Sequence, residues 1–136
     1  MAFIDANGVP EARVPAPFER SLKVVMSPET HPDVHGFTLI FSTLAPRGGS
    51  TDYHAHEGSG ELMVFTSGLG RAWLDGEEHE IRPGTVMYAP EGVEHRTVNT
   101  GDEPLEIVCV FVPPVSDDYV RRNVEEADAR RGDGDA

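Results

Sequence analysis

The sequence is short of cysteine and of long apolar runs, and each shortage excludes a class of protein. The chain of 136 residues has one cysteine, Cys109, so it holds no internal disulfide, which fits a reducing compartment. No apolar run approaches the roughly 18 residues that a membrane-spanning helix needs. The stretch from Met1 to Pro17 lacks the basic start and apolar core of a secretory signal. We therefore expect a cytoplasmic protein.

Basic residues are also scarce. The chain has 11 Lys and Arg against 24 Asp and Glu, a formal net charge of −13. Affinity for nucleic acids comes mostly from neutralising phosphates, so this field opposes DNA, RNA and anionic membrane surfaces. We expect neither a nucleic acid nor a membrane as partner, and we attribute the excess acid to solubility.

What the sequence does contain is a series of short β-type runs, rich in Val, Ile, Thr, Phe and Tyr and separated by turn residues. The Asp75-Gly76 pair between two runs predicts a tight hairpin, because such turns need positive φ. Many short strands at even spacing predict an all-β sandwich or small antiparallel barrel. The expected strands are residues 22–26, 37–44, 51–56, 61–67, 71–74, 78–81, 85–89, 94–99 and 105–111.

The two ends of the chain differ from this β region. Residues 1–20 are expected to form an irregular N-terminal arm, and residues 21–115 the β domain. In residues 116–136, the apolar side chains Val120, Val124 and Ala127 recur at helical spacing and predict a short C-terminal helix. The Gly- and Asp-rich end from Gly132 is expected to be a disordered tail.

Four residues form a candidate metal site. His54 and His56 are two apart, so on a strand both side chains would share one face. A turn after His56 would bring Glu61 beside them, and His95 begins a later run. Three imidazoles and one carboxylate suit Fe, Mn, Ni, Co, Cu or Zn.

Each of these residues also has an ordinary structural explanation. A His-x-His pair alone is more often a half-exposed strand edge than a metal site. Glu61 alone would usually be a solvated strand residue, and His95 alone a turn histidine bonded to the backbone. The spacing of these residues along the sequence decides between separate structural roles and one shared metal site.

The spacing forms two motifs. Gly48 is followed after five residues by His54-x-His56, then Glu61 and Gly68, while Gly84 is followed after five residues by Pro90-x-Gly92, then His95 and Asn99. At every defining position these motifs resemble the two conserved motifs of the cupin superfamily. The 15 residues between them resemble the connection in small single-domain cupins.

The resemblance implies a double-stranded β-barrel of the cupin, or jelly-roll, type with a metal inside. It implies that the ligands are His54, His56, Glu61 and His95, which leave about two positions of an octahedral metal open for water or substrate. It also implies a homodimer, to which the N-terminal arm and an exposed sheet edge would contribute.

Alternation predicts the walls of a substrate pocket, because residues two and four beyond an inward ligand point the same way. For the run at residues 37–44, the sequence leaves open which face is inward. Nothing in the sequence identifies a general base. The expected substrate-contacting residues are Met63, Phe65, Thr97 and, as a half-buried neighbour, Tyr88.

The resemblance leaves several functions open. Cupins with this ligand set include dioxygenases, oxalate-degrading enzymes, sugar-phosphate isomerases, lyases and polyketide cyclases. Cupins that cleave sulfonium propionates have a tyrosine two residues beyond the metal glutamate, where this chain has Met63, so that lyase activity is disfavoured. We prefer a dioxygenase-type oxidoreductase acting on a small oxygen-chelating substrate. The alternatives are a Lewis-acid isomerase, cyclase or lyase, and a non-enzymatic binding protein.

Overall fold

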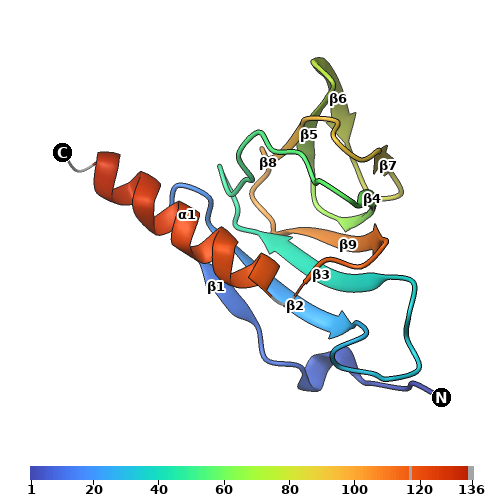
Figure 1. The fold of residues 1–136 in the computed structure, drawn as a ribbon. Helices are drawn as coiled ribbons and strands as arrows, with labels where there is room; N and C mark the ends of the chain where they lie inside the picture. Colours follow the sequence, from blue (N-terminus) through green and yellow to red (C-terminus); the bar gives the residue numbers. More distant parts are fainter. Residues whose placement is uncertain (117, 135–136) are drawn as a thin grey trace.

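The computed structural model describes residues 1–116 and 118–134, which form two antiparallel sheets and a C-terminal helix (Figure 1). The larger sheet has the order β1-β2-β3-β9-β4-β7, and the smaller has the order β6-β5-β8. The elements are the 3₁₀ turn Ala6–Gly8, β1 Ala12–Val14, β2 Arg20–Met26, β3 Thr38–Leu44, β4 Gly60–Ser67, β5 Gly70–Leu74, β6 Glu77–Ile81, β7 Val86–Ala89, β8 His95–Asn99, β9 Leu105–Val112 and α1 Asp118–Gly134.

The interior follows from two-residue alternation along the strands. In β3, Thr38, Ile40, Ser42 and Leu44 are buried, which settles the inward face that the sequence left open. Inward residues of both sheets, among them Met63 of β4, Thr97 of β8 and Cys109 of β9, line one inner cavity. The sheets therefore face each other, and the predicted all-β cupin-type class is confirmed.

The hairpin between β5 and β6 forms as predicted. Asp75 and Gly76 take φ values of 50° and 82°, and Leu74 pairs with Glu77 across the turn. Two consecutive positive φ values match the right-handed twist of the flanking strands. Glycine meets this requirement without the strain that a side chain would add.

Two expectations from the sequence are wrong, one about a strand and one about the N-terminal arm. Residues 51–56 form no strand, because Ser50 and His54 each make only an isolated bridge, to Val98 and His95. The arm at residues 1–20 is not wholly irregular, because β1 pairs with β2 of the same chain. Both differences depend on pairing with distant segments, which residues 51–56 largely lack and β1 gains from β2, and local patterning does not reveal such pairing.

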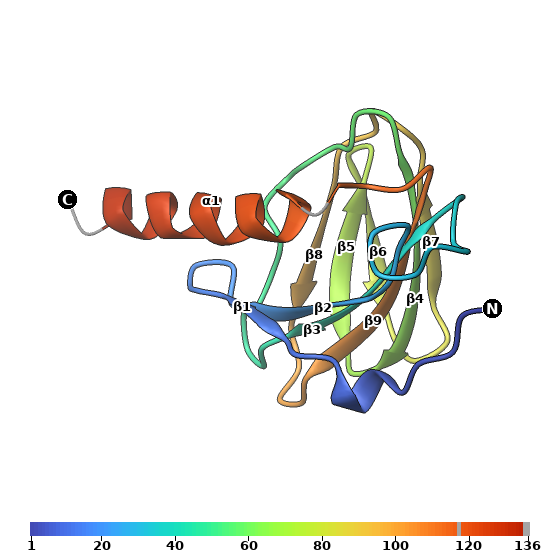
Figure 2. The same cartoon turned by 60° about the horizontal axis from the view of Figure 1, so that its bottom comes forward.

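The C-terminal helix is longer than expected. It reaches Gly134, so a disordered tail does not begin at Gly132, and residues 135–136 lie outside the described part. Ala127 is fully buried, and Val120 and Val124 pack against the core. Figure 2 shows the helix beginning beside the sheets and projecting away toward the C-terminus. Among the described residues, no helix combines the length and apolar character needed to cross a bilayer.

Candidate metal centre

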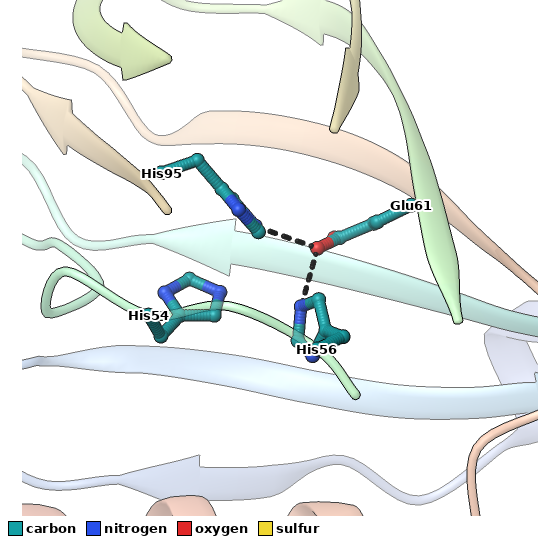
Figure 3. Close-up of side chains that lie close together, drawn as sticks. All are labelled: His54, His56, Glu61 and His95. Carbon is teal, nitrogen blue, oxygen red and sulfur yellow. Dashed lines mark hydrogen bonds and ion pairs between the residues drawn. The ribbon is translucent and has the colours of Figure 1, made fainter. Parts of the chain in front are cut away.

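The four sequence-predicted ligands lie together, as Figure 3 shows. His54 and His56 come from the segment before β4, Glu61 from the start of β4, and His95 from the first position of β8. One donor atom from each residue lies within 4.8 Å of those from the others. Residues far apart in the sequence thus form one cluster between the two sheets.

A backbone bridge fixes the position of His54. Its N–H donates to the carbonyl of His95 at 3.0 Å, and the N–H of His95 donates back to the carbonyl of His54 at 2.8 Å. The two imidazole centroids are 4.2 Å apart. A single bridge therefore aligns the first histidine with β8, where the sequence suggested a whole strand.

Hydrogen bonds to carbonyl groups orient two of the rings. Nδ1 of His54 lies 2.7 Å from the carbonyl oxygen of Asp52, and Nδ1 of His95 lies 3.0 Å from that of Val93. Because a carbonyl only accepts, each Nδ1 carries the proton and each Nε2 keeps its lone pair when the ring is neutral. This is the usual way in which an outer hydrogen bond prepares a histidine for metal binding.

Glu61 holds the centre of the cluster. Its Oε1 lies 2.9 Å from Nε2 of His56 and 3.1 Å from Nε2 of His95, although the residue is only 5% exposed. Burial alone would raise the pKa of Glu61, but hydrogen bonds from His56 and His95 hold it at about 2. Glu61 is therefore an anion at neutral pH, as a metal ligand must be.

The pKa values of His54 and His95 are shifted in opposite directions. Burial and the neighbouring charge of His95 lower the pKa of His54 to about 4, so this ring is neutral at physiological pH. For His95, burial favours the neutral ring, but the hydrogen bond to Glu61 and its charge raise the pKa above the usual value. The carboxylate of Glu61 therefore favours the protonated form of His95.

The donor set fits a divalent metal. Imidazole nitrogens from three histidines and a carboxylate oxygen from Glu61 converge on one place. A metal ion would replace the proton shared with Glu61 and use lone pairs that otherwise have no acceptor role. The cluster is able to bind a divalent transition metal, with Fe, Mn, Ni, Co, Cu and Zn all compatible with these donors.

Two spaces that share Arg20, Thr51, His54 and Tyr119 as lining residues adjoin the cluster. The inner cavity, of about 30 Å³, has Glu61, His95, Met63 and Thr97 among its lining residues. The entrance pocket, of about 420 Å³, lies between the segment carrying His54 and His56 and the start of α1. The pocket has the size of a small-molecule site, and two of the four ligands face it.

The expected pocket residues divide into three groups. Met63 and Thr97 line the inner cavity. Phe65 is fully buried in the core but is not among the residues lining either space. The assignment of Tyr88 is corrected, because it is 54% exposed on the outer face of β7 while Met87 and Ala89 point inward. Strand alternation places it opposite to the pocket.

Three ionisable residues of the inner cavity were not anticipated: Arg20 of β2, Cys109 of β9 and Tyr119 of α1. The Tyr119 ring lies 5.6 Å from the ring of His56 and 5.1 Å from that of Phe111. Burial is the main cause that raises the pKa of both Cys109 and Tyr119, and that lowers the pKa of Arg20. Alternation from Phe111 could have identified Cys109, but nothing local connects β2 or α1 with the site.

Comparison with known proteins agrees with this geometry. Residues 40–111 match the cupin domain family, and the chain belongs to it. It is 32% identical over 88 residues to an uncharacterised protein of Methanocaldococcus jannaschii, covering 63% of this chain and 70% of that protein. It is 39% identical over 72 residues to the glucose-6-phosphate isomerase of Pyrococcus abyssi, covering 49% of this chain. The matched region spans only 38% of that enzyme.

Solved structures share the fold. A predicted oxalate decarboxylase from Thermotoga maritima superposes with a TM-score of 0.73 at 22% identity, covering 82% of this chain and 99% of that one. KdgF from Halomonas sp. superposes with a TM-score of 0.71, also at 22% identity, covering 87% and 97%. At such identities the likeness establishes the jelly-roll architecture alone.

Proposed function

We propose that this protein is a metal-dependent enzyme acting on a small organic substrate that chelates the metal through oxygen, with dioxygenase-type oxidoreductase chemistry. The observation that carries the proposal is a three-histidine, one-glutamate cluster in which Glu61 and His95 are buried and the half-buried His54 and His56 face the entrance pocket. Four protein ligands leave positions open on an octahedral metal, the mark of a working site rather than a structural one. When bound, the metal supplies Lewis acidity and, if redox-active, oxygen chemistry.

The walls of the inner cavity favour oxidation over proton abstraction. Apart from the ligands, its ionisable residues are Arg20, Cys109 and Tyr119. The raised pKa values keep the thiol and the phenol protonated, and arginine stays a cation, so none is a base at neutral pH. The remaining walls are mostly apolar, but a space of about 30 Å³ has room only for a water or two, so the body of a substrate would lie in the entrance pocket of about 420 Å³.

Similarity to a glucose-6-phosphate isomerase supports a second candidate, a Lewis-acid isomerase, cyclase or lyase. Proton transfer would then fall to carboxylates of the entrance pocket, where Asp52, Glu57 and Glu126 lie. Asp52 already forms an ion pair with Arg130 at 2.9 Å, so Glu57 and Glu126 are the better candidates.

The test is oxygen uptake by iron-loaded protein, measured with an oxygen electrode across a panel of 1,2-dicarbonyl and 2-hydroxycarbonyl compounds. We expect uptake with at least one compound, lost in Glu61→Gln and kept in Glu57→Gln, a matched change at the exposed rim. If products form without oxygen uptake and depend on Glu57 or Glu126, Lewis-acid chemistry replaces oxidation. Stoichiometric binding without turnover would make the protein a non-enzymatic binder.

We also propose a homodimer. Exposed apolar residues gather on the outer face of β4, β7 and β9, namely Leu62, Val86, Tyr88 and Val112. In the described chain β7 ends the larger sheet, so its edge is open for pairing. Light scattering of full-length protein should give twice the chain mass, and Tyr88→Glu should shift it toward the monomer. A monomeric wild-type protein at micromolar concentration contradicts the proposal.

A further inference from the structure

Arg20 is a buried cation beside the metal cluster. It opens β2, is only 7% exposed, and lines both the entrance pocket and the inner cavity. His54 lines the same two spaces. A molecule that passes from the entrance toward the metal therefore meets this guanidinium.

The hydrogen bonds of Arg20 all go to neutral oxygens. Its Nη1 donates to the carbonyls of Phe18 at 3.0 Å and Ser50 at 3.3 Å, and its Nη2 donates to Oδ1 of Asn123 at 2.6 Å. The amide of Asn123 is itself oriented, because its Nδ2 donates to the Tyr119 carbonyl at 2.7 Å. Within the described residues, no carboxylate forms a salt bridge with Arg20.

This arrangement is costly for a residue with a purely structural role. A buried cation is stabilised far better by a carboxylate than by amide and carbonyl oxygens. Position 123 could supply that carboxylate as aspartate with no change in size, but the chain has asparagine there. The guanidinium thus has no carboxylate bonded to it, and Glu126 and Glu61 act on it only through their charges.

The lining of the entrance pocket, in contrast to the cationic Arg20, is rich in acidic residues. Asp52, Glu57 and Glu126 lie around it, and the one other cation among its lining residues is the exposed Arg122. These acids give the entrance no general attraction for anions, so any preference for an anionic substrate must arise at the buried guanidinium.

We propose that Arg20 binds the carboxylate of the substrate, which is therefore a small organic acid with a keto or hydroxyl oxygen placed to reach the metal. The inference rests on the proposed function and narrows its substrate class. Arginine suits the role because its planar donors match a carboxylate, and its location beside His54 puts the neighbouring oxygen of a 2-oxo or 2-hydroxy acid toward the cluster.

The test uses cobalt-loaded full-length protein and two probes, pyruvate and its uncharged analogue hydroxyacetone. Binding is followed by the visible absorption of cobalt and by calorimetry. Wild-type protein should bind pyruvate at least about tenfold more tightly than hydroxyacetone. Asn123→Asp supplies an internal carboxylate to Arg20, so it should weaken pyruvate binding by about tenfold and leave hydroxyacetone binding unchanged.

Arg122→Gln is the matched control, because it makes the same change of one negative unit in net charge at the rim. It should alter pyruvate binding less than about twofold, as expected for a screened surface charge. Arg20→Gln, checked for folding by circular dichroism, should lose the preference for pyruvate as Asn123→Asp does.

The outcomes separate the two proposals. If hydroxyacetone changes the cobalt spectrum but pyruvate binds no better, or if Arg122→Gln weakens pyruvate as much as Asn123→Asp, Arg20 is not the anion-binding residue and the proposed function stands. If neither compound changes the cobalt spectrum, the metal is closed to substrates, and the proposed function is overturned together with this inference.

Discussion

The inward-facing side chains of strands β4 and β9 differ in chemistry between the two ends of the strand pair. At one end Glu61 lies opposite Phe111 and next to the buried histidines, and at the other Phe65 lies opposite Ile107. We call these the metal end and the apolar end. The apolar end buries hydrocarbon, which stabilises the fold, whereas the metal end buries ionisable groups, which costs stability unless they are paired. The difference indicates that the fold depends on one end and the function on the other.

The largest stability change is expected at the apolar end. Phe65→Ala removes a fully buried ring and should cost about 3–5 kcal/mol, because it leaves a cavity that the surrounding strands cannot close. For a domain of this size the melting temperature should fall by roughly 10 °C or more. Metal content at a temperature where the variant is folded should not change. If the variant loses its metal while still folded, the two ends are not independent.

Metal removal should have a smaller effect on stability. An ion that binds only the folded state adds about 2.7 kcal/mol when free metal exceeds its dissociation constant a hundredfold. A chelator should then lower the melting temperature at pH 7.5 by roughly 8 °C. The apo protein should remain folded, because the apolar end does not involve the metal. Unfolding on chelation would show that the metal end also carries the fold.

The chelator effect should shrink at pH 5. The pKa of His95 is raised in the folded protein, so its pairing with Glu61 stabilises the apo protein. This stabilisation has its full value below the ordinary histidine pKa, and it is lost as the pH rises through the raised pKa. At pH 5 a proton on His95 competes with the metal. The lowered pKa of His54 acts oppositely, since it destabilises the folded state as pH falls from its ordinary value toward about 4. An equal chelator shift at both pH values contradicts His95 as a ligand.

The smallest effect is expected where the two ends meet. Met63 lies between Glu61 and Phe65 on the inner face of β4 and lines the inner cavity. Met63→Leu nearly conserves volume and should cost less than about 1.5 kcal/mol with metal content unchanged. Thermal melting and metal analysis of the same sample measure both quantities. A loss of metal here would extend the metal end further along β4 than we infer.

Much of the metal end could be predicted from the sequence. The spacing of the two motifs resembles that of cupins, and this resemblance assigned His54, His56, Glu61 and His95 together although each has an ordinary explanation alone. The Asp75-Gly76 turn and the helical spacing of Val120, Val124 and Ala127 were readable because their signals are local.

The rest depended on contacts between distant segments. Arg20 and Tyr119 lie about a hundred residues apart in sequence and meet only because α1 packs beside β1 and β2. Tyr88 was misassigned because alternation fixes a strand's two faces but not which face is inward. Strand β1 has three residues, too few for a periodic signal.

The most direct test of the account is the metal content of untreated protein, determined by mass spectrometry for wild type and for variants. Wild type should contain one transition metal per chain, and the double variant His54→Ala, His56→Ala should contain none while remaining folded. The matched double variant His31→Ala, His35→Ala, outside the cluster, should keep the wild-type content. Iron or copper would support oxygen chemistry, and zinc alone the Lewis-acid alternative. Stoichiometric metal in the His54, His56 variant would contradict the assignment of the metal centre.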